Sequence, residues 1–453
     1  MTVQPARRIA LDVIIAVRES DAYANLLLPV RLERAKLSTA DAGLATELTY
    51  GTLRRQGYYD AVLAIAAGRP VEKIDPAILD VLRLACHQLL SMRVAQHAAV
   101  DESVQLAKTV GSNSAVGFVN GVLRTITRST PQEWLERTQI GVIGDNALAI
   151  RESHPLWIVR AFKQALAAEG RESELDELIE ADNVAPRVSI TALPGYATVD
   201  ELDAYAGVFS PVGAILDSGD PLQLRAVREG RARVQDEGSQ LAALALSRAR
   251  PVAQGEQWLD LCAGPGGKAA LLTAEARQGG AIMTANELVP ARAQLVRNAL
   301  AVFENPPEVW EEDGTSIGER YPEAFDRILL DAPCTGLGAL RRRPEARWRK
   351  VPRDVAQLAG LQAALLSSAL TALKPGGILA YVTCSPHLAE TKVIVEGALK
   401  KWSTVSRIDT KAVLDAVTAQ PLDLPDTEHV QLWPHRHGTD AMFIQLLTKG
   451  PKT

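Results

Sequence analysis

Cysteine is scarce in this chain of 453 residues: there are four, far apart in the sequence. Four separated cysteines in a chain of this length do not form a disulfide framework, so we expect a reducing, cytoplasmic environment. No apolar run approaches the ~18 residues that a membrane span needs. The N-terminus carries Arg7, Arg8 and Asp12, unlike a secretory signal. The sequence therefore predicts a soluble cytoplasmic protein without a membrane partner, and we expect a monomer.

The formal net charge is −5, which by itself disfavours a nucleic-acid partner. Its distribution is uneven, because residues 1–130 hold 15 Lys and Arg against 12 Asp and Glu. Residues 341–350 carry six positive charges and one negative, with Trp348 among the arginines. A local basic patch can bind phosphate despite a negative total, and an interleaved aromatic side chain can stack on an unpaired base. A solvated charged loop is the other interpretation of this stretch.

The length predicts two or three domains. Residues 1–130 show helical periodicity only, with helices expected at about 38–53, 75–90, 98–110 and 114–127. Residues 131–144 contain Pro131 and two glycines and are expected to be a linker. Residues 145–235 mix helical and strand patterns and predict a small α+β module. From 236 to 450 strands and helices alternate, which predicts a parallel sheet of the Rossmann-like α/β class.

Three apolar strands of the last region end in turns that carry unusual residues. The sequences are LDLCAGPGGK at 259–268, DAPCTGLG at 331–338 and TCSP at 383–386. Parallel strands build their sites at their carboxyl ends. We therefore expect the glycine loop, Cys334 and Cys384 to share one edge of the sheet.

The glycine loop and the acids at the following strand ends favour a nucleoside ligand. Glycines at 264, 266 and 267 allow a tight turn and close backbone approach, although a plain strand-to-helix turn has the same glycines. Glu287 ends the second strand and could accept the ribose hydroxyls, Asp313 could meet an adenine amino group, and Asp331 ends the fourth strand. The loop lacks the Gly-Lys-Ser/Thr ending of a phosphate loop, so a polyphosphate is not expected.

The two strand-end cysteines fit covalent catalysis. Neither lies in a Cys-x-x-Cys pattern, so no metal site is predicted. Cytosine needs such a nucleophile, because its carbon 5 reacts with a methyl donor only after a thiolate has added to carbon 6. Cys86 and Cys262 are interpreted as small buried hydrophobic residues.

These motifs resemble those of RNA cytosine-5 methyltransferases, namely the Sun/Fmu (RsmB-like) and NOL/NOP proteins. The resemblance covers about residues 145–450 and includes PHRHGTDAMF at 434–443. The helical N-terminus, with TYGTLR at 49–54 and FVNGVLR at 118–124, resembles the NusB-like RNA-binding domain. This pairing is typical of the bacterial enzymes that methylate a cytosine of 16S ribosomal RNA.

The resemblance implies a role for each site residue. Cys384 would be the nucleophile, Cys334 would resolve the adduct, and Asp331 would belong to both the catalytic and the cofactor groups. The S-adenosylmethionine site would comprise Cys262, Ala263, Gly264, Pro265, Gly266, Gly267, Lys268, Glu287, Asp313 and Asp331. The expected RNA contacts are Arg341, Arg342, Arg343, Arg347 and Trp348. The loop departs from the family pattern at Gly264 and Ala269, and the second strand ends in Asn-Glu where Asp is usual.

Three other functions stay open. The target could be another RNA, such as tRNA or 23S ribosomal RNA. The chain could be a non-catalytic NusB-like RNA-binding factor, although such a factor does not need two strand-end thiols. A DNA cytosine methyltransferase would use the cysteine of the Pro-Cys motif as nucleophile and would lack the Thr-Cys motif.

Overall fold

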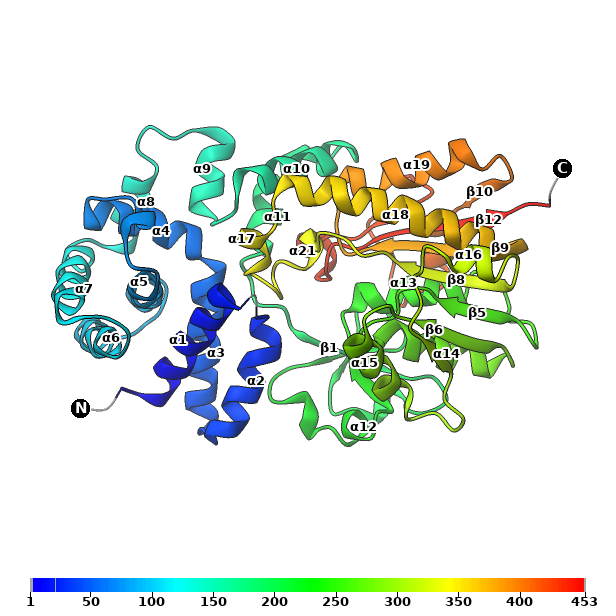
Figure 1. Cartoon of the computed structure of the whole chain (residues 1–453), viewed down its shortest axis with the longest axis horizontal. Helices are drawn as coiled ribbons and strands as arrows, with labels where there is room; N and C mark the ends of the chain where they lie inside the picture. The colour runs from blue at the N-terminus through cyan, green and yellow to red at the C-terminus, as the bar shows by residue number, and fades with distance from the viewer. Residues whose placement is uncertain (1–2, 21, 452–453) are drawn as a thin grey trace. The chain divides into compact units, whose positions relative to one another are not determined.

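The computed structural model describes residues 3–20 and 22–451 (Figure 1). The chain forms two compact units. The first, called here the helical unit, comprises Met1–Lys163, Arg171–Ala185 and Leu340–Arg349. The second, called the sheet unit, comprises Gln164–Gly170, Pro186–Ala339 and Lys350–Thr453.

The helical unit is built from amphipathic helices with conventional caps. Ser38 accepts a hydrogen bond from the Asp41 amide at the start of α3, and Asp75 caps α5 in the same way. Leucine, valine and isoleucine side chains from α1 to α7 meet in one core, so the predicted helical N-terminus is confirmed. The helices are α1 (Pro5–Glu19), α2 (Ala24–Ala35), α3 (Thr39–Arg54), α4 (Gln56–Ala67), α5 (Pro76–Leu90), α6 (Gln96–Val110), α7 (Asn113–Ile126), α8 (Pro131–Thr138), α9 (Gly144–Arg151), α10 (Leu156–Ala167), α11 (Leu175–Ala181) and α17 (Ala346–Arg349).

The stretch 131–144, expected to be a linker, contains the helix α8. Thr130 and Glu133 form a capping box at its start, with Pro131 at the first helical position. Trp134 is fully buried in the helical core, and its indole nitrogen donates to the Ile126 carbonyl at 2.9 Å. Proline here begins a helix instead of interrupting structure, which is why the sequence pattern was misleading.

A small antiparallel sheet opens the sheet unit. Its strands are β1 (Val188–Ala192), β2 (Tyr205–Ala206), β3 (Gly213–Leu216) and β4 (Ala232–Val234), in the order β2-β3-β1-β4. With the short helix α12 (Arg225–Arg228) it encloses its own apolar cluster. The region 145–235 is thus divided, because α9 and α11 belong to the helical unit while the small sheet belongs to the sheet unit.

The large sheet has the predicted α/β pattern. Its order is β10-β12-β9-β8-β5-β6-β7, with β11 paired to β12. The five strands from β9 to β7 are parallel, and β12 runs antiparallel to β9. The order reverses between β5 and β8, and sheets of this kind bind ligands at the carboxyl ends of the strands at such a point. The strands are β5 (Gln257–Asp260), β6 (Ile282–Asn286), β7 (Glu308–Trp310), β8 (Phe325–Asp331), β9 (Leu373–Thr383), β10 (Val405–Ile408), β11 (Val430–Gln431) and β12 (Phe443–Lys449).

Helices cover both faces of this sheet, with α18 and α19 on one side and α14 and α15 on the other (Figure 1). Along β8, Leu329 points to the α14 side, and its neighbours Ile328 and Leu330 point to the α18 side. Burial of both faces explains why these strands read as continuous apolar runs. The helices of this unit are α13 (Glu237–Ser247), α14 (Gly267–Gln278), α15 (Pro290–Leu300), α16 (Ile317–Arg320), α18 (Pro352–Ala372), α19 (Lys392–Lys401), α20 (Thr410–Asp415) and α21 (Pro434–His437).

One helix corrects the expectation that no segment is apolar enough to span a membrane. By length and composition alone α18 qualifies, with 21 residues and a mean hydropathy of 1.4. Its apolar side, which includes Leu365, Leu366 and Leu370, is buried against β8 and β9. The composition of α18 is therefore that of a core helix in an α/β unit.

Candidate active site

Two cysteines lie in contact at the carboxyl edge of the large sheet. Cys334 follows β8 and Cys384 follows β9, and their Sγ atoms are 3.4 Å apart. The strand pairing continues into both loops, because the Ala332 amide donates to the Val382 carbonyl at 2.8 Å. The Gly338 amide then donates to the Cys384 carbonyl at 2.9 Å. The edge position expected from the strand ends is what the structure shows.

The surroundings of the two thiols differ in charge. The pKa of Cys334 is raised well above the ordinary thiol value, first by its hydrogen bond with Cys384 and by burial, and then by nearby negative groups that include Glu390 and Asp331. Two thiols in contact do not ionise together easily. Cys334 therefore keeps its proton and can donate it to the Cys384 sulfur in a hydrogen bond.

Lys268 supplies a positive charge next to the thiols. Its Nζ donates to Asp331 Oδ2 at 2.8 Å and to Ser239 Oγ at 2.6 Å. Burial lowers the pKa of Lys268, but the attraction of Asp331, Cys384 and Asp260 outweighs burial and leaves that pKa raised. The ammonium group of Lys268 therefore stays charged and interacts electrostatically with Cys384.

The acid at the end of β6 is fixed by backbone amides. Glu287 accepts from the Gly264 amide at 3.1 Å and from the Val289 amide at 3.0 Å, and its Oε2 lies 3.3 Å from an Arg292 nitrogen. A β-carbon added at Gly264 would lie 2.3 Å from Glu287 Oε2. A larger residue at 264 would therefore require the ends of the Glu287 and Arg292 side chains to shift.

Asn286 ties the next loop to the site. Its side chain donates to the carbonyls of Leu261 and Glu312 at 3.1 and 3.0 Å, and accepts from the Glu312 amide at 3.0 Å. Asp313 follows directly and is exposed. It accepts from the amide and hydroxyl of Thr315, which lower its pKa. The strand ends of β6 and β7 are thereby held in register beside the glycine loop.

Comparison with known proteins agrees with this geometry. A family model for 16S rRNA methyltransferases RsmB/F matches residues 249–448, and a NusB family model matches residues 4–128. A Mycobacterium tuberculosis protein named as a methyltransferase is 47% identical over 98% of this chain and 96% of its own length. The Bacillus subtilis "Probable ribosomal RNA small subunit methyltransferase B" is 30% identical over 98% of each chain. This chain belongs to the RsmB/F family.

The fold of this RsmB/F protein is also that of a solved structure. The crystal structure of PH0851 matches it with a TM-score of 0.80 at 22% identity, covering 99% of this chain and 100% of the other. The chain is an rRNA methyltransferase that depends on S-adenosylmethionine. The side chains present fit that cofactor, because Glu287, Asp313 and Asp331 all offer acceptors to a ligand that carries hydroxyl and amino donors.

Two residues of the glycine loop have structural roles in the fold. Gly266 has φ +106°, and a β-carbon there would lie 2.5 Å from the Ala299 side chain on α15. The conformation and the packing of α15 therefore require glycine at 266, whereas the sequence pattern had indicated close approach to a ligand. Burial raises the pKa of Cys262, which makes this thiol unreactive, in agreement with its interpretation as a small core residue.

The basic segment 340–349 lies within the helical unit, and this changes the expected role of two arginines. Arg347 is fully buried and donates to the carbonyls of Arg54, Ser153 and Asp182 at 3.0, 3.2 and 2.7 Å. Arg341 is also buried. The Arg347 guanidinium group is bonded inside the helical unit and Arg341 is buried, so we do not retain these two as phosphate contacts.

Trp348 packs against Gly57, where a β-carbon would come within 2.4 Å of its ring. Its indole is thereby engaged within the helical unit. Arg343 is exposed, with its guanidinium 5.6 Å from the centre of the Tyr23 ring. Arg342 is partly exposed. These two arginines are the members of the segment that can still meet RNA.

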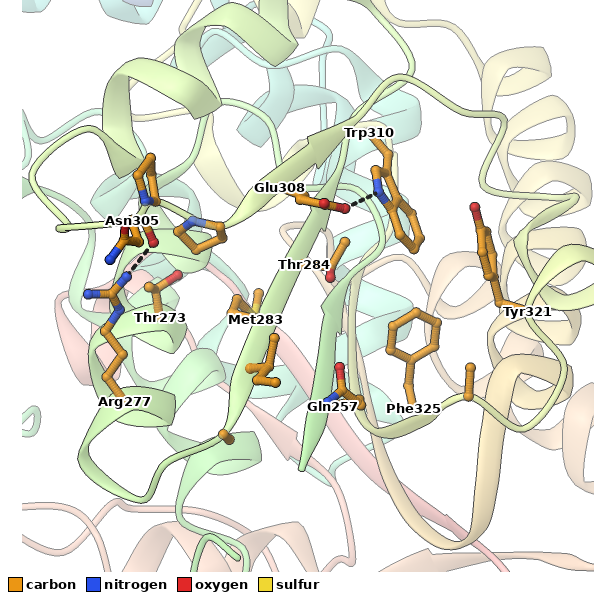
Figure 2. A pocket seen from close by; sticks show the side chains of 15 residues that line it. Gln257, Thr273, Arg277, Met283, Thr284, Asn305, Glu308, Trp310, Tyr321 and Phe325 are labelled. Atoms are coloured by element: carbon orange, nitrogen blue, oxygen red, sulfur yellow. Dashed lines mark hydrogen bonds between the residues drawn. The ribbon is translucent and has the colours of Figure 1, made fainter. Parts of the chain in front are cut away.

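The sequence analysis did not single out Ser239, which receives the Lys268 hydrogen bond, or Glu390, which contacts both cysteine loops. The sequence does show an acid, Glu390, six residues after Cys384, and this short spacing could have indicated that Glu390 lies near the cysteine loops. A cavity of about 670 Å³ lies elsewhere, at the amino-terminal ends of the strands, where Gln257, Glu308 and Phe325 begin β5, β7 and β8 (Figure 2). It lies at the edge opposite the cysteines.

Proposed function

We propose that this RsmB/F protein methylates carbon 5 of a cytosine in 16S ribosomal RNA, with Cys384 as the attacking nucleophile. The observation that carries the proposal is the contact between the Cys334 and Cys384 sulfurs at the carboxyl edge of the sheet, beside Lys268. Cys384 would attack the cytosine, and Cys334 would assist release of the methylated product. The target base would be splayed out of its RNA context to reach them.

The bonds balance as follows. The Cys384 thiolate adds to carbon 6 of cytosine, and the electrons of the 5,6 double bond pass to carbon 5. S-adenosylmethionine, which the glycine loop, Glu287 and Asp313 would hold, would supply the electrophilic methyl group for carbon 5 and would leave as the neutral thioether. A base then removes the proton from carbon 5, the double bond re-forms, and the carbon–sulfur bond breaks to return the Cys384 thiolate.

The polar groups at the edge support this division of roles. Lys268 is charged and interacts electrostatically with Cys384, and the protonated Cys334 thiol can hydrogen-bond to the Cys384 sulfur. Glu287 would bind the ribose hydroxyls, and Asp313 would bind the adenine amino group. Asp331 would keep Lys268 in place through their hydrogen bond.

Substitution of the two thiols tests the assignment. Cys384→Ala should form no covalent RNA adduct and transfer no methyl group. Cys334→Ala should accumulate a protein–RNA adduct that survives denaturing electrophoresis, while multiple turnover fails. Cys86→Ala, which changes a buried thiol on α5, should behave as the wild-type protein does.

The reverse result would support the arrangement of DNA cytosine methyltransferases: an adduct in Cys384→Ala and no activity in Cys334→Ala. A non-catalytic RNA-binding factor would transfer no methyl group in any form of the protein. The RNA class is tested by sequencing 5-methylcytosine in RNA from a deletion strain. Loss from 16S RNA supports the proposal, and loss from tRNA or 23S RNA supports the alternative.

We also propose that the protein acts in the cytoplasm as a monomer. Ribosomal RNA is its substrate class, and reduced cysteines are required for the chemistry described above. Sedimentation equilibrium of the full chain measures the oligomeric state.

A further inference from the structure

Glu390 is a fully buried acid that lies between the two cysteine loops. It ends the short 3-10 helix η6 (Leu388–Glu390), six residues after Cys384. A buried carboxylate is costly unless hydrogen bonds satisfy it. The donors that reach Glu390 come from neutral groups on Thr335, Ser385 and Gln362.

Each cysteine has a direct neighbour bonded to this carboxylate. Thr335, next to Cys334, donates its amide at 2.8 Å and its hydroxyl at 2.5 Å. Ser385, next to Cys384, donates its hydroxyl at 2.7 Å. One carboxylate therefore joins the loop after β8 to the loop after β9.

The carboxylate is itself anchored from two further sides. Gln362 on α18 donates to Glu390 at 3.2 Å and to the Pro333 carbonyl, just before Cys334, at 2.9 Å. The Tyr381 hydroxyl donates to the Glu390 backbone carbonyl at 2.7 Å. The position of Glu390 is thus fixed by α18 and β9, and it can transmit that rigidity to both loops.

We propose that Glu390 is a positioning residue that holds the Cys334 loop against the Cys384 loop and so keeps the two thiols in contact. The spacing of the thiols follows from the contacts above and is independent of the methylated base. The effect on turnover rests on the proposed roles of Cys334 and Cys384.

Glu390→Ala leaves the Thr335 amide and the Gln362 side chain without this acceptor and removes the link that the carboxylate makes between the two loops. A displacement of about 1 Å at a reacting group can cost a hundredfold in rate, so we expect kcat to fall about a hundredfold while the KM for RNA changes little. Glu390→Gln should retain most of the rate, because the Thr335 and Ser385 hydroxyls can turn and accept from the new amide.

Thiol oxidation measures the spacing without any methyl transfer. Diamide takes one hydrogen atom from each of the two thiols and joins the sulfurs in a disulfide, which mass spectrometry detects in the full chain. The wild-type protein and Glu390→Gln should form the Cys334–Cys384 disulfide quickly. Glu390→Ala should form this disulfide at about one tenth of the wild-type rate or below, as expected when two thiols lose their fixed geometry.

Whether the variants form the disulfide more slowly or faster than the wild-type protein distinguishes a positioning role of Glu390 from a simple effect of its charge. The Glu390 charge contributes to the raised pKa of Cys334. If charge were its only role, both variants would ionise Cys334 more readily and would oxidise faster than the wild-type protein. Slower oxidation in Glu390→Ala alone supports positioning, and faster oxidation in both variants overturns it.

Two controls keep the result interpretable. Glu275→Ala removes another buried carboxylate of the sheet unit, one that pairs with Ser247 and Arg248, and should oxidise at the wild-type rate. If Glu390→Ala does not fold, the double variant Thr335→Val with Ser385→Ala removes the hydroxyl contacts and should also slow oxidation. Wild-type oxidation and turnover in that variant would overturn the inference.

Failure of the proposed function would be visible separately. If Cys384→Ala still transferred methyl groups, the cytosine mechanism would fall, while a slowed disulfide in Glu390→Ala would still establish the positioning role.

Discussion

Asp260, the last residue of β5, has the most perturbed carboxyl group of the site. Burial, followed by the charge of Asp331, raises its pKa to about 8. In the unfolded chain an aspartate has a pKa of about 3.9. Between these two values the unfolded chain has lost this proton while the folded protein keeps it. The contribution of Asp260 to stability is therefore fully present below pH 4 and is lost as the pH rises toward 8.

The prediction at the residue scale concerns this pH dependence. The side chain of Asp260→Asn cannot ionise. The melting temperature of the ligand-free variant, relative to that of the wild-type protein, should therefore increase as the pH rises from 5 to 8. Differential scanning calorimetry at both values gives the comparison. Asp313→Asn, at an exposed acid, should show no such gain. Parallel melting curves for Asp260→Asn and the wild-type protein would show that the buried carboxyl group is ionised throughout.

At the element scale, local sequence patterns were sufficient to predict those helices and strands whose stabilising contacts come from residues near in the sequence. The helices α3, α5, α6 and α7 and the strands that end at Asp331 and Thr383 follow from periodicity, caps and apolar runs. Because parallel strands align their carboxyl ends, the placement of two thiols from distant motifs at one edge of the sheet could be predicted too. The Glu390 contacts could not, because they depend on how η6, α18 and the two loops pack together.

The segment 340–349 shows the limit of charge patterns. The six positive charges of residues 341–350 indicated an RNA surface, but the acceptors that surround the buried Arg347 are carbonyls from residues 54, 153 and 182. A fourth acceptor is the Asn183 side chain at 2.8 Å. Nothing in the local sequence distinguishes an arginine that faces solvent from one that satisfies distant carbonyls.

We therefore predict that Arg347→Met destabilises the helical unit. Each buried acceptor left without a donor costs about 1–3 kcal/mol, and four acceptors are affected, so the loss should reach about 3 kcal/mol or more. Arg343→Ala, on the same segment but exposed, should leave the melting temperature unchanged and should weaken RNA binding with a flatter salt dependence. Urea unfolding measures the stability of both variants, and RNA titrations at two salt concentrations measure the RNA affinity and its salt dependence. Equal stability of the two variants would contradict the structural role of Arg347.

At the scale of the whole molecule, the chain leaves the sheet unit after Ala339 and returns to it at Lys350. The segment between them is held by the first helices of the chain. Glu345 accepts from the Ala24 amide at 3.1 Å, and Arg349 donates to the Val17 and Ala22 carbonyls. The segment begins two residues after Gly338, whose amide donates to the Cys384 carbonyl. The N-terminal helices thus fix a segment that is continuous in the chain with the loop that carries Cys334.

Deletion of residues 1–130 should consequently do more than remove RNA contacts. S-adenosylmethionine binding should persist, because its residues lie in the sheet unit, which has apolar cores of its own. The KM for RNA should rise, since contacts remote from the chemistry are lost.

The same deletion should make the amides of residues 340–349 exchange rapidly in hydrogen–deuterium exchange, because their partners at 17, 22, 24 and 54 are gone. The strands β8 and β9 should stay protected. The full-length Arg347→Met variant should show the same local exchange with most of its RNA affinity retained. A segment that stays protected after the deletion would show that it does not depend on the N-terminal helices.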